Sequence, residues 1–288
     1  RMLFVDIFPC EDGEAQERRI LPEVIAAAQK NELYIDDRNF CTTGFLFGLA
    51  GQGAFFVTRQ HKSTLTWEDE TKPKKVGRNE NGVIYEQLLH LTSGPHTLTV
   101  RRITVKLDEP TRDGETEINV LTNLPPGDAN ALKVAVLYLT RWTIENAFQE
   151  IEQALRSEIN TLGYPGAALL GFSIAAVMYN VLSVTKWAIE REHSDQVTRD
   201  QLSGYYLAAI VSEDYGGMMI ALPEEDWTKR YATLTPQAFA NHLRACAKYV
   251  RPDSIRKNVR GPKKPPPKRS SGKIEHHVST AQLIAELK

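Results

Sequence analysis

The clearest hydrophobic period in the chain lies between residues 138 and 155. Ile144, Phe148, Ile151 and Leu155 recur at intervals of four, three and four residues. This period predicts a helix with one buried face.

A polar stripe accompanies this apolar face. Tyr138, Arg141, Glu145 and Glu152 are three, four and seven residues apart, so on a continuous helix they share one side. A carboxylate beside an apolar seam, with an arginine one turn before it, suits a metal ligand next to a phosphate clamp. An ordinary amphipathic helix with an Arg–Glu pair on its solvated side explains the same residues, and on this stretch alone that interpretation is favoured.

The amino-terminal pattern predicts alternating strands and helices. The expected elements are a strand at 2–8, a helix at 14–30, a strand at 33–36, a helix at 41–50 and a strand at 54–59. Asp37 follows the strand at 33–36, and ligand-binding residues collect at such strand ends in α/β sheets. A turn or helix-capping role explains Asp37 as well, and Asp36 could serve equally.

From residue 61 to residue 115 the pattern becomes β-rich. Strand-like runs at 83–91 and 97–107 are separated by charged loops containing Gly and Pro, which predicts an inserted β-rich subdomain. Two basic clusters occur in it: Lys72, Lys74, Lys75 and Arg78 in a loop, and Arg101, Arg102 and Lys106 along a strand. Clusters of this kind are usually solvated faces, and nucleic-acid contact is the alternative.

The second half of the chain reads as mainly helical. A strand at 117–121 returns to the main sheet, Asp128 is a candidate helix cap, and a bend near Thr140 would separate Tyr138 from the polar stripe. The uncharged run at 167–184 approaches the length of a membrane span, but a fully buried helix is the favoured interpretation. Further helices are expected at 201–211 and 236–250.

Composition and charge set limits on function. The 288 residues are 42% hydrophobic and 25% charged, with a net charge of −1, so any DNA binding must come from local patches. Three widely spaced cysteines argue against a disulfide framework or a zinc site and fit a reducing compartment. The tail at 251–288 is expected to be disordered; its first 23 residues hold nine Lys or Arg against one Asp, and Lys263 and Lys264 are candidate DNA contacts.

Two blocks of sequence resemble the insertion-sequence-four group of DDE transposases. The spacing Tyr138, Arg141, Glu145 is similar to that group's Tyr-Arg-Glu-Lys signature, although Glu152 stands where the group has Lys or Arg. The step from Asp37 to Phe40 resembles the Asp-Arg-Gly/Asn-aromatic step that carries the second catalytic aspartate. The blocks occur in the family's order and, with the β-rich spacer between them, cover about residues 1–190.

The resemblance implies an α/β fold with a partial ribonuclease H-like core at 1–60 and 116–195. A β-rich insertion at 61–115 and a helical carboxy-terminal region at 196–250 would complete the ordered chain. It also implies metal-dependent DNA cleavage and strand transfer in transposition, with Mg²⁺ (or Mn²⁺ as a substitute) held by Asp37 and Glu145. Tyr138 and Arg141 would contact the transposon-end backbone, and Lys74 and Lys75 of the insertion would also contact DNA. The implied partners are transposon-end and target DNA, with a homodimer on DNA in a bacterial cytoplasm, at the nucleoid.

The family's first catalytic aspartate has no match in these residues. Asp6 is too close to Asp37 for the hairpin and helix that should lie between them, so the expectation is that the first aspartate lies upstream of residue 1. A non-catalytic DNA-binding remnant of a transposase is therefore the alternative function, and a single-span membrane protein is a third.

Overall fold

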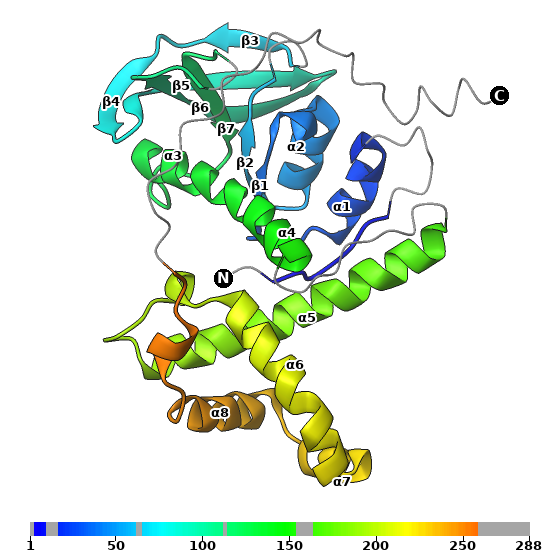
Figure 1. The fold of residues 1–288 in the computed structure, drawn as a ribbon. Coiled ribbons are helices and arrows are strands. Elements are labelled where there is room, and N and C mark those ends of the chain that lie inside the picture. The colour runs from blue at the N-terminus through cyan, green and yellow to red at the C-terminus, as the bar shows by residue number, and fades with distance from the viewer. Residues whose placement is uncertain (1–2, 10–16, 62–64, 112–113, 154–163, 259–288) are drawn as a thin grey trace, which may run out of the picture. The chain divides into compact units, whose positions relative to one another are not determined.

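The chain forms two compact units in the computed structural model, which describes residues 3–9, 17–61, 65–111, 114–153 and 164–258 (Figure 1). We call Phe8–Thr143 the sheet unit. Arg1–Ile7 together with Ile144–Lys288 form the helical unit. The division between them falls inside the signature segment, between Arg141 and Glu145.

Within the described part of the sheet unit, seven strands form one mixed sheet. Its order is β1-β2-β7-β6-β5-β3, and β4 also pairs with β5. β1 and β2 are parallel, and every other pair is antiparallel. The strands are β1 Leu33–Asp36, β2 Phe55–Arg59, β3 Trp67–Glu70, β4 Lys74–Asn79, β5 Gly82–Ser93, β6 His96–Leu107 and β7 Glu117–Thr122.

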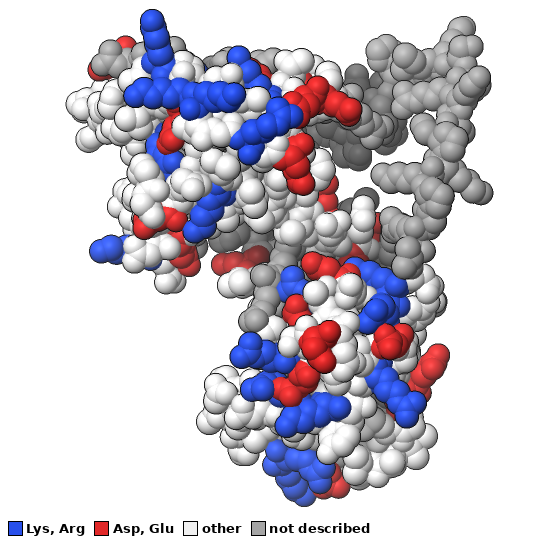
Figure 2. All heavy atoms as spheres, turned by 90° about the vertical axis from the view of Figure 1, so that its left-hand side faces the viewer, with Lys and Arg blue, Asp and Glu red and all other residues white. Residues whose placement is uncertain are grey.

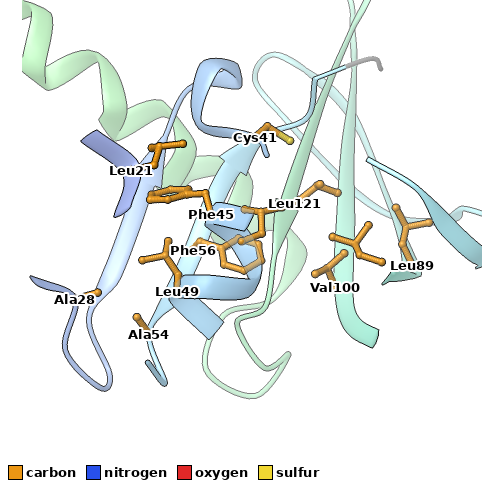
Figure 3. Packing of buried hydrophobic residues seen from close by; sticks show 12 residues of the cluster. Leu21, Ala28, Cys41, Phe45, Leu49, Ala54, Phe56, Leu89, Val100 and Leu121 are labelled. Carbon is orange, nitrogen blue, oxygen red and sulfur yellow. The ribbon is translucent and has the colours of Figure 1, made fainter. Parts of the chain in front are cut away.

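Helices cover both faces of this sheet. After the 3-10 turn η1 (Glu17–Ile20), α1 (Leu21–Ala27) and α2 (Thr43–Gly51) pack on one face, where Phe45, Phe56 and Leu121 are almost fully buried (Figure 3). α3 (Ala131–Leu139) packs on the other face against Val57, Ile103 and Val120. This arrangement follows from strand alternation, because neighbouring residues of one strand belong to opposite cores.

The predicted β-rich insertion is part of the main sheet. β6 pairs with β7 along six residue positions and with β5 along twelve, so the sheet continues from the core strands into the insertion. The sequence pattern locates these strands correctly, but it carries no information on which strand pairs with which. The two long strands therefore extend the core and do not form a separate β-subdomain.

The signature segment at 138–152 is not one continuous α-helix, because a 3-10 turn interrupts it near Thr140. α3 ends at Leu139, the 3-10 turn η3 spans Thr140–Trp142, and α4 runs over Thr143–Gln153. The cap that begins α3 is Asn130, whose side chain accepts from the backbone N–H of Lys133 at 2.9 Å, and not the predicted Asp128. The one polar stripe expected from a continuous helix is therefore divided among three elements.

The described residues of the helical unit form α4 and four further helices. These are α5 Pro165–Glu192, α6 Gly204–Ala221, α7 Glu224–Tyr231 and α8 Pro236–Ala247, with 3-10 turns η4 Arg199–Gln201 and η5 Pro252–Ile255. Ile189, Leu202 and Ile255 lie in its main core, and each is at most 2% exposed. Residues 251–258, predicted as the start of a disordered tail, are thus folded, because Ile255 supplies apolar surface and Arg256 pairs with Leu202 in a β-bridge.

α5 differs from the predicted fully buried helix. Ala175, Ala176 and Tyr179 are buried, whereas Leu170, Val177 and other large apolar residues of the same helix are exposed. By length and composition α5 is also the one helix of the described chain that is apolar enough to cross a membrane. A helix that packs along one stripe needs only that stripe to be apolar. The prediction from the uncharged run therefore overestimated the burial of α5.

The strand predicted at 2–8 is also absent from the described residues of that segment. Leu3–Pro9 have no strand assignment, and the backbone N–H and C=O of Phe4 bond to the side-chain amide of Asn180 at 2.8 and 2.7 Å. The ring of Phe4 packs against Phe148, Phe172 and Tyr179. The apolar residues that suggested a strand therefore anchor this segment on α4 and α5 of the helical unit.

Candidate functional site

Asp37 is the first residue after strand β1. Its backbone is extended (φ −82°, ψ −177°), and its carboxylate accepts a hydrogen bond from the backbone N–H of Asn39 at 2.7 Å, which caps the 3-10 turn η2 (Arg38–Phe40). The capping role considered from the sequence is therefore present. One such bond leaves most of the acceptor positions of a carboxylate available, so Asp37 also fits the chemistry of a metal ligand.

Strand alternation distinguishes Asp37 from Asp36. Tyr34 packs with the core under α1 and α2, and Ile35 packs with the core under α3. Because side chains alternate along an extended chain, Asp36 lies on the face of Tyr34, and Asp37 lies on the face of Ile35 and α3. On β2 the same rule assigns Arg59 to the face of Val57, which is also the α3 face.

Tyr138 at the end of α3 meets this face. It is 5% exposed, and its hydroxyl is hydrogen-bonded by the side chains of Arg59 and Arg141. Burial raises the pKa of Tyr138 above its ordinary value of 10.0, although both arginines act to lower it. The face thus combines one carboxylate, one phenol and two arginines, a set that suits a phosphate ester. Arg59 is the member of this set that the sequence analysis missed; its position at the end of β2, two residues after the buried Val57, was the available signal.

Asp36 lies on the other face of β1, beside Thr58. It is half-buried, and its carboxylate accepts a hydrogen bond from the hydroxyl of Thr58 at 3.4 Å. Burial raises its pKa from 3.8 to about 7; the bond from Thr58 opposes the rise, and the charge of Asp37 adds to it. Asp36 is therefore protonated at mildly acidic pH, which favours a structural role for it.

We predict that Asp36→Asn removes a pH dependence of stability. Because the folded pKa of about 7 lies above the ordinary 3.8, the folded state holds more protons between these values. The contribution of protonated Asp36 to the free energy of unfolding is complete below about pH 4 and is lost as pH rises to about 7. It amounts to at most about 4 kcal/mol, and to less because the side chain is partly exposed. Urea unfolding from about pH 5 to about pH 8 should show this fall in the parent chain and not in Asp36→Asn, with the exposed Asp128→Asn as baseline. Equal slopes in all three proteins would contradict it.

Glu145 lies in the first turn of α4, in the helical unit, and its side chain is exposed. α4 is held against α5 by the rings of Phe148 and Phe172 and by an ion pair between Glu150 and Lys186. Burial lowers the pKa of Lys186, and Glu150 acts in the opposite direction. Rigid packing of the following turns supports a fixed orientation of α4, which is what a metal-ligating Glu145 would require.

The other predicted contact residues are lysines of β4 and of the carboxy-terminal tail. Lys74 and Lys75 are exposed on β4, whereas Lys263 and Lys264 lie outside the described residues. Arg101, predicted in a basic strand, is only 4% exposed and belongs to the interior. Over the face in Figure 2, Lys and Arg alternate with Asp and Glu, as expected for a chain with almost no net charge. Within the described ranges, no three His, Cys, Asp or Glu side chains are grouped so that they could hold a metal ion.

Comparison with known proteins gives two matches. Residues 2–181 match the protein family described as "Transposase DDE domain". A Sinorhizobium fredii (strain NBRC 101917 / NGR234) protein named "Putative transposase y4zB" is 30% identical over 184 residues, which cover 62% of this chain and 48% of that protein. The chain thus aligns with about half the length of this relative.

Proposed function

The chain belongs to the family of transposase DDE domains, and from this premise we propose that it acts on DNA in transposition through a ribonuclease H-like core. The observation that supports the proposal best lies on the α3 side of the sheet, where the side chains of Arg59 and Arg141 bond to the hydroxyl of Tyr138. Strand alternation assigns Asp37 to the same side. A carboxylate beside arginines is suited to a metal ion next to a phosphodiester.

The proposed metal ligands are Asp37 and Glu145. Their pairing rests on the resemblance to the insertion-sequence-four group, since they belong to different units. Mg²⁺ (or Mn²⁺) held by these carboxylates would supply Lewis-acid stabilisation of the attacking and leaving oxygens of a phosphodiester. The residues themselves contribute orientation: the bond from the N–H of Asn39 fixes the Asp37 carboxylate, and packing on α5 fixes α4.

In this proposal Tyr138 acts mainly through its neighbours. A side chain that is 5% exposed offers little surface to DNA, but its hydroxyl orients Arg59 and Arg141. Arg141 would then make the direct contact with the transposon-end backbone, as the signature implies. Exposed Lys74 and Lys75 of β4 and Lys263 and Lys264 of the tail would add contacts that do not depend on base sequence.

The experiment that tests DNA binding compares Arg141→Gln with Arg230→Gln, an exposed arginine of α7. Both substitutions remove one positive charge. We expect Arg141→Gln to weaken binding of a labelled duplex by about tenfold, the value of one charge-assisted contact, and Arg230→Gln to change it less than threefold. Equal affinities for the two variants would argue against the proposed interface.

The basic tail is expected to supply salt-sensitive affinity. Residues 259–273 contain six Lys or Arg, and if about half of them meet phosphates, the slope of log K against log salt should become shallower by about 3 when residues 259–288 are deleted. The measurement is duplex affinity at several salt concentrations with and without these residues. An unchanged slope would show that the tail does not contact the backbone.

A non-catalytic DNA-binding remnant of a transposase is the second candidate. It would retain the fold and the basic surfaces without the metal-dependent chemistry. Both candidates imply an intracellular, DNA-associated protein, and we propose the bacterial cytoplasm and a homodimer on DNA for either. They differ in whether the complete protein cleaves DNA.

A further inference from the structure

A cavity of about 590 Å³ lies at the end of strand β2 in the sheet unit. Its wall is formed by β2 and the residues after it, by β7, and by Arg38 next to Asp37. This volume is within the range of small-ligand sites and is large enough for a nucleotide. One wall group, the side-chain carbonyl oxygen of Gln60, is buried and has no hydrogen-bond partner in the structure. A buried acceptor of this kind is costly unless a ligand or solvent supplies a donor.

One carboxylate at this cavity holds two arginines. Glu115 forms ion pairs with Arg38, at 3.4 Å, and with Arg59. Arg59 in turn bonds to the hydroxyl of Tyr138, which is also bonded by Arg141. Three arginines are thus linked through one carboxylate and one phenol, so the network carries two more positive than negative charges.

We propose that Glu115 occupies the position of a DNA phosphate, and that a backbone phosphodiester displaces it so that Arg38 and Arg59 bind the DNA. The inference rests on the proposed function, because the ligand is the phosphodiester of the DNA substrate. Two arginines converging on a carboxylate present the geometry that also binds a phosphate. Glu115 is 25% exposed in its side chain and follows Gly114, whose backbone has a positive φ of 81°. Glu115 therefore precedes β7 at the cavity edge, and its side chain can leave the arginines by rotation, with the backbone pairing of the sheet unchanged.

The network also explains how Glu115 would make the arginine pair selective for DNA over other anions. While Glu115 is paired with Arg38 and Arg59, weak anions must compete with a carboxylate already held by two partners. A DNA phosphate gains from additional contacts along the backbone, including those proposed for Arg141, and so can displace the carboxylate. Glu115 would accordingly lower affinity for anions in general while leaving the engaged DNA complex intact.

The test uses the whole 288-residue chain and a short labelled DNA duplex. Glu115→Gln removes the competing charge and should tighten DNA binding by about tenfold, whereas Asp226→Asn, which removes a charge from the exposed pair with Lys229 on α7, should change it less than threefold. Arg38→Gln should weaken binding by about tenfold relative to Arg230→Gln, and in the Arg38→Gln background the gain from Glu115→Gln should fall below threefold. The Arg38 side chain is 53% exposed, so Arg38→Gln is expected to leave the fold intact. This variant therefore still tests the inference if Glu115→Gln fails to fold.

The outcomes are distinguishable. If the parent chain binds no DNA, the proposed function and this inference both fail. If it binds DNA but Glu115→Gln matches Asp226→Asn, or lowers the melting temperature without tightening binding, Glu115 is a structural ion-pair partner and the inference alone is overturned. The remaining experiment measures the melting temperature with inorganic phosphate at constant ionic strength. If phosphate raises the melting temperature of Glu115→Gln more than that of the parent chain, and DNA binding is no tighter, the arginine pair binds a free anion and the assignment to DNA is overturned.

Discussion

A labelled duplex incubated with the 288-residue chain and Mg²⁺ should remain uncut. A two-metal phosphoryl-transfer site holds its ions about 3.5–4 Å apart and shares a carboxylate between them. The chain offers Asp37 and Glu145 as proposed ligands, and the described residues contain no group of three metal-binding side chains. Two carboxylates are enough for one hydrated Mg²⁺ that keeps several waters. If these residues do not supply the shared ligand, charge on both the attacking and the leaving oxygen would be uncompensated, and the rate should be undetectable.

The assay is nicking of a labelled transposon-end duplex in the presence of Mg²⁺ or Mn²⁺, with DNA binding measured in parallel. Binding without nicking is the expected combination. Robust nicking would show that the chain already completes the site, with Asp6 as the first residue to test. In that case Asp37→Asn and Glu145→Gln should each abolish nicking while sparing DNA binding. If they do not, the carboxylate assignments themselves are wrong.

The local elements of the sheet unit were predictable because their signals are local. The strands at 33–36 and 54–59 and the helix at 41–50 each coincide with an element in the structure to within two residues. Short apolar runs bounded by turn residues are sufficient to identify them. An interruption of the helix near Thr140 was also considered from the sequence, and the 3-10 turn η3 is found there.

Partnerships between distant segments were not predictable. The run at 2–8 has the composition of a strand, yet Phe4 bonds to Asn180, 176 residues away, and no local pattern specifies that choice. The hydrogen bond between Tyr138 and Arg59 likewise joins α3 to β2, and it depends on the position of β2 in the sheet. Sequence spacing suggested that Tyr138 and Arg141 belong together, but the role of Arg59 emerges only when β2 is placed beside β1.

Arg101 gives the sharpest difference between charge pattern and structure. In the sequence it is one of three cations on a strand, and the pattern allowed a DNA-contact role for it. In the structure it is 4% exposed; its guanidinium bonds to Glu86 at 2.6 Å and to the backbone carbonyls of Leu124 and Ala129 at 2.9 and 2.8 Å. Those two carbonyls belong to the segment just before α3. A buried cation therefore fastens the start of the helix that carries Tyr138.

We predict that Arg101→Met lowers the free energy of unfolding by about 3–5 kcal/mol, because it leaves a carboxylate and two buried carbonyls without their donor. Arg102→Met is the matched control. Arg102 is the next residue on the same strand, it bonds to Gln87 at 3.1 Å and lies over the ring of Trp67, and its loss should cost no more than about 1 kcal/mol. Urea unfolding of both variants provides the comparison. Because removing both members of an ion pair is cheaper than removing one, Arg101→Met combined with Glu86→Leu should recover part of the loss. Near-equal stability of Arg101→Met and the parent chain, with weaker DNA binding, would instead return Arg101 to the DNA-contact role that the charge pattern allowed.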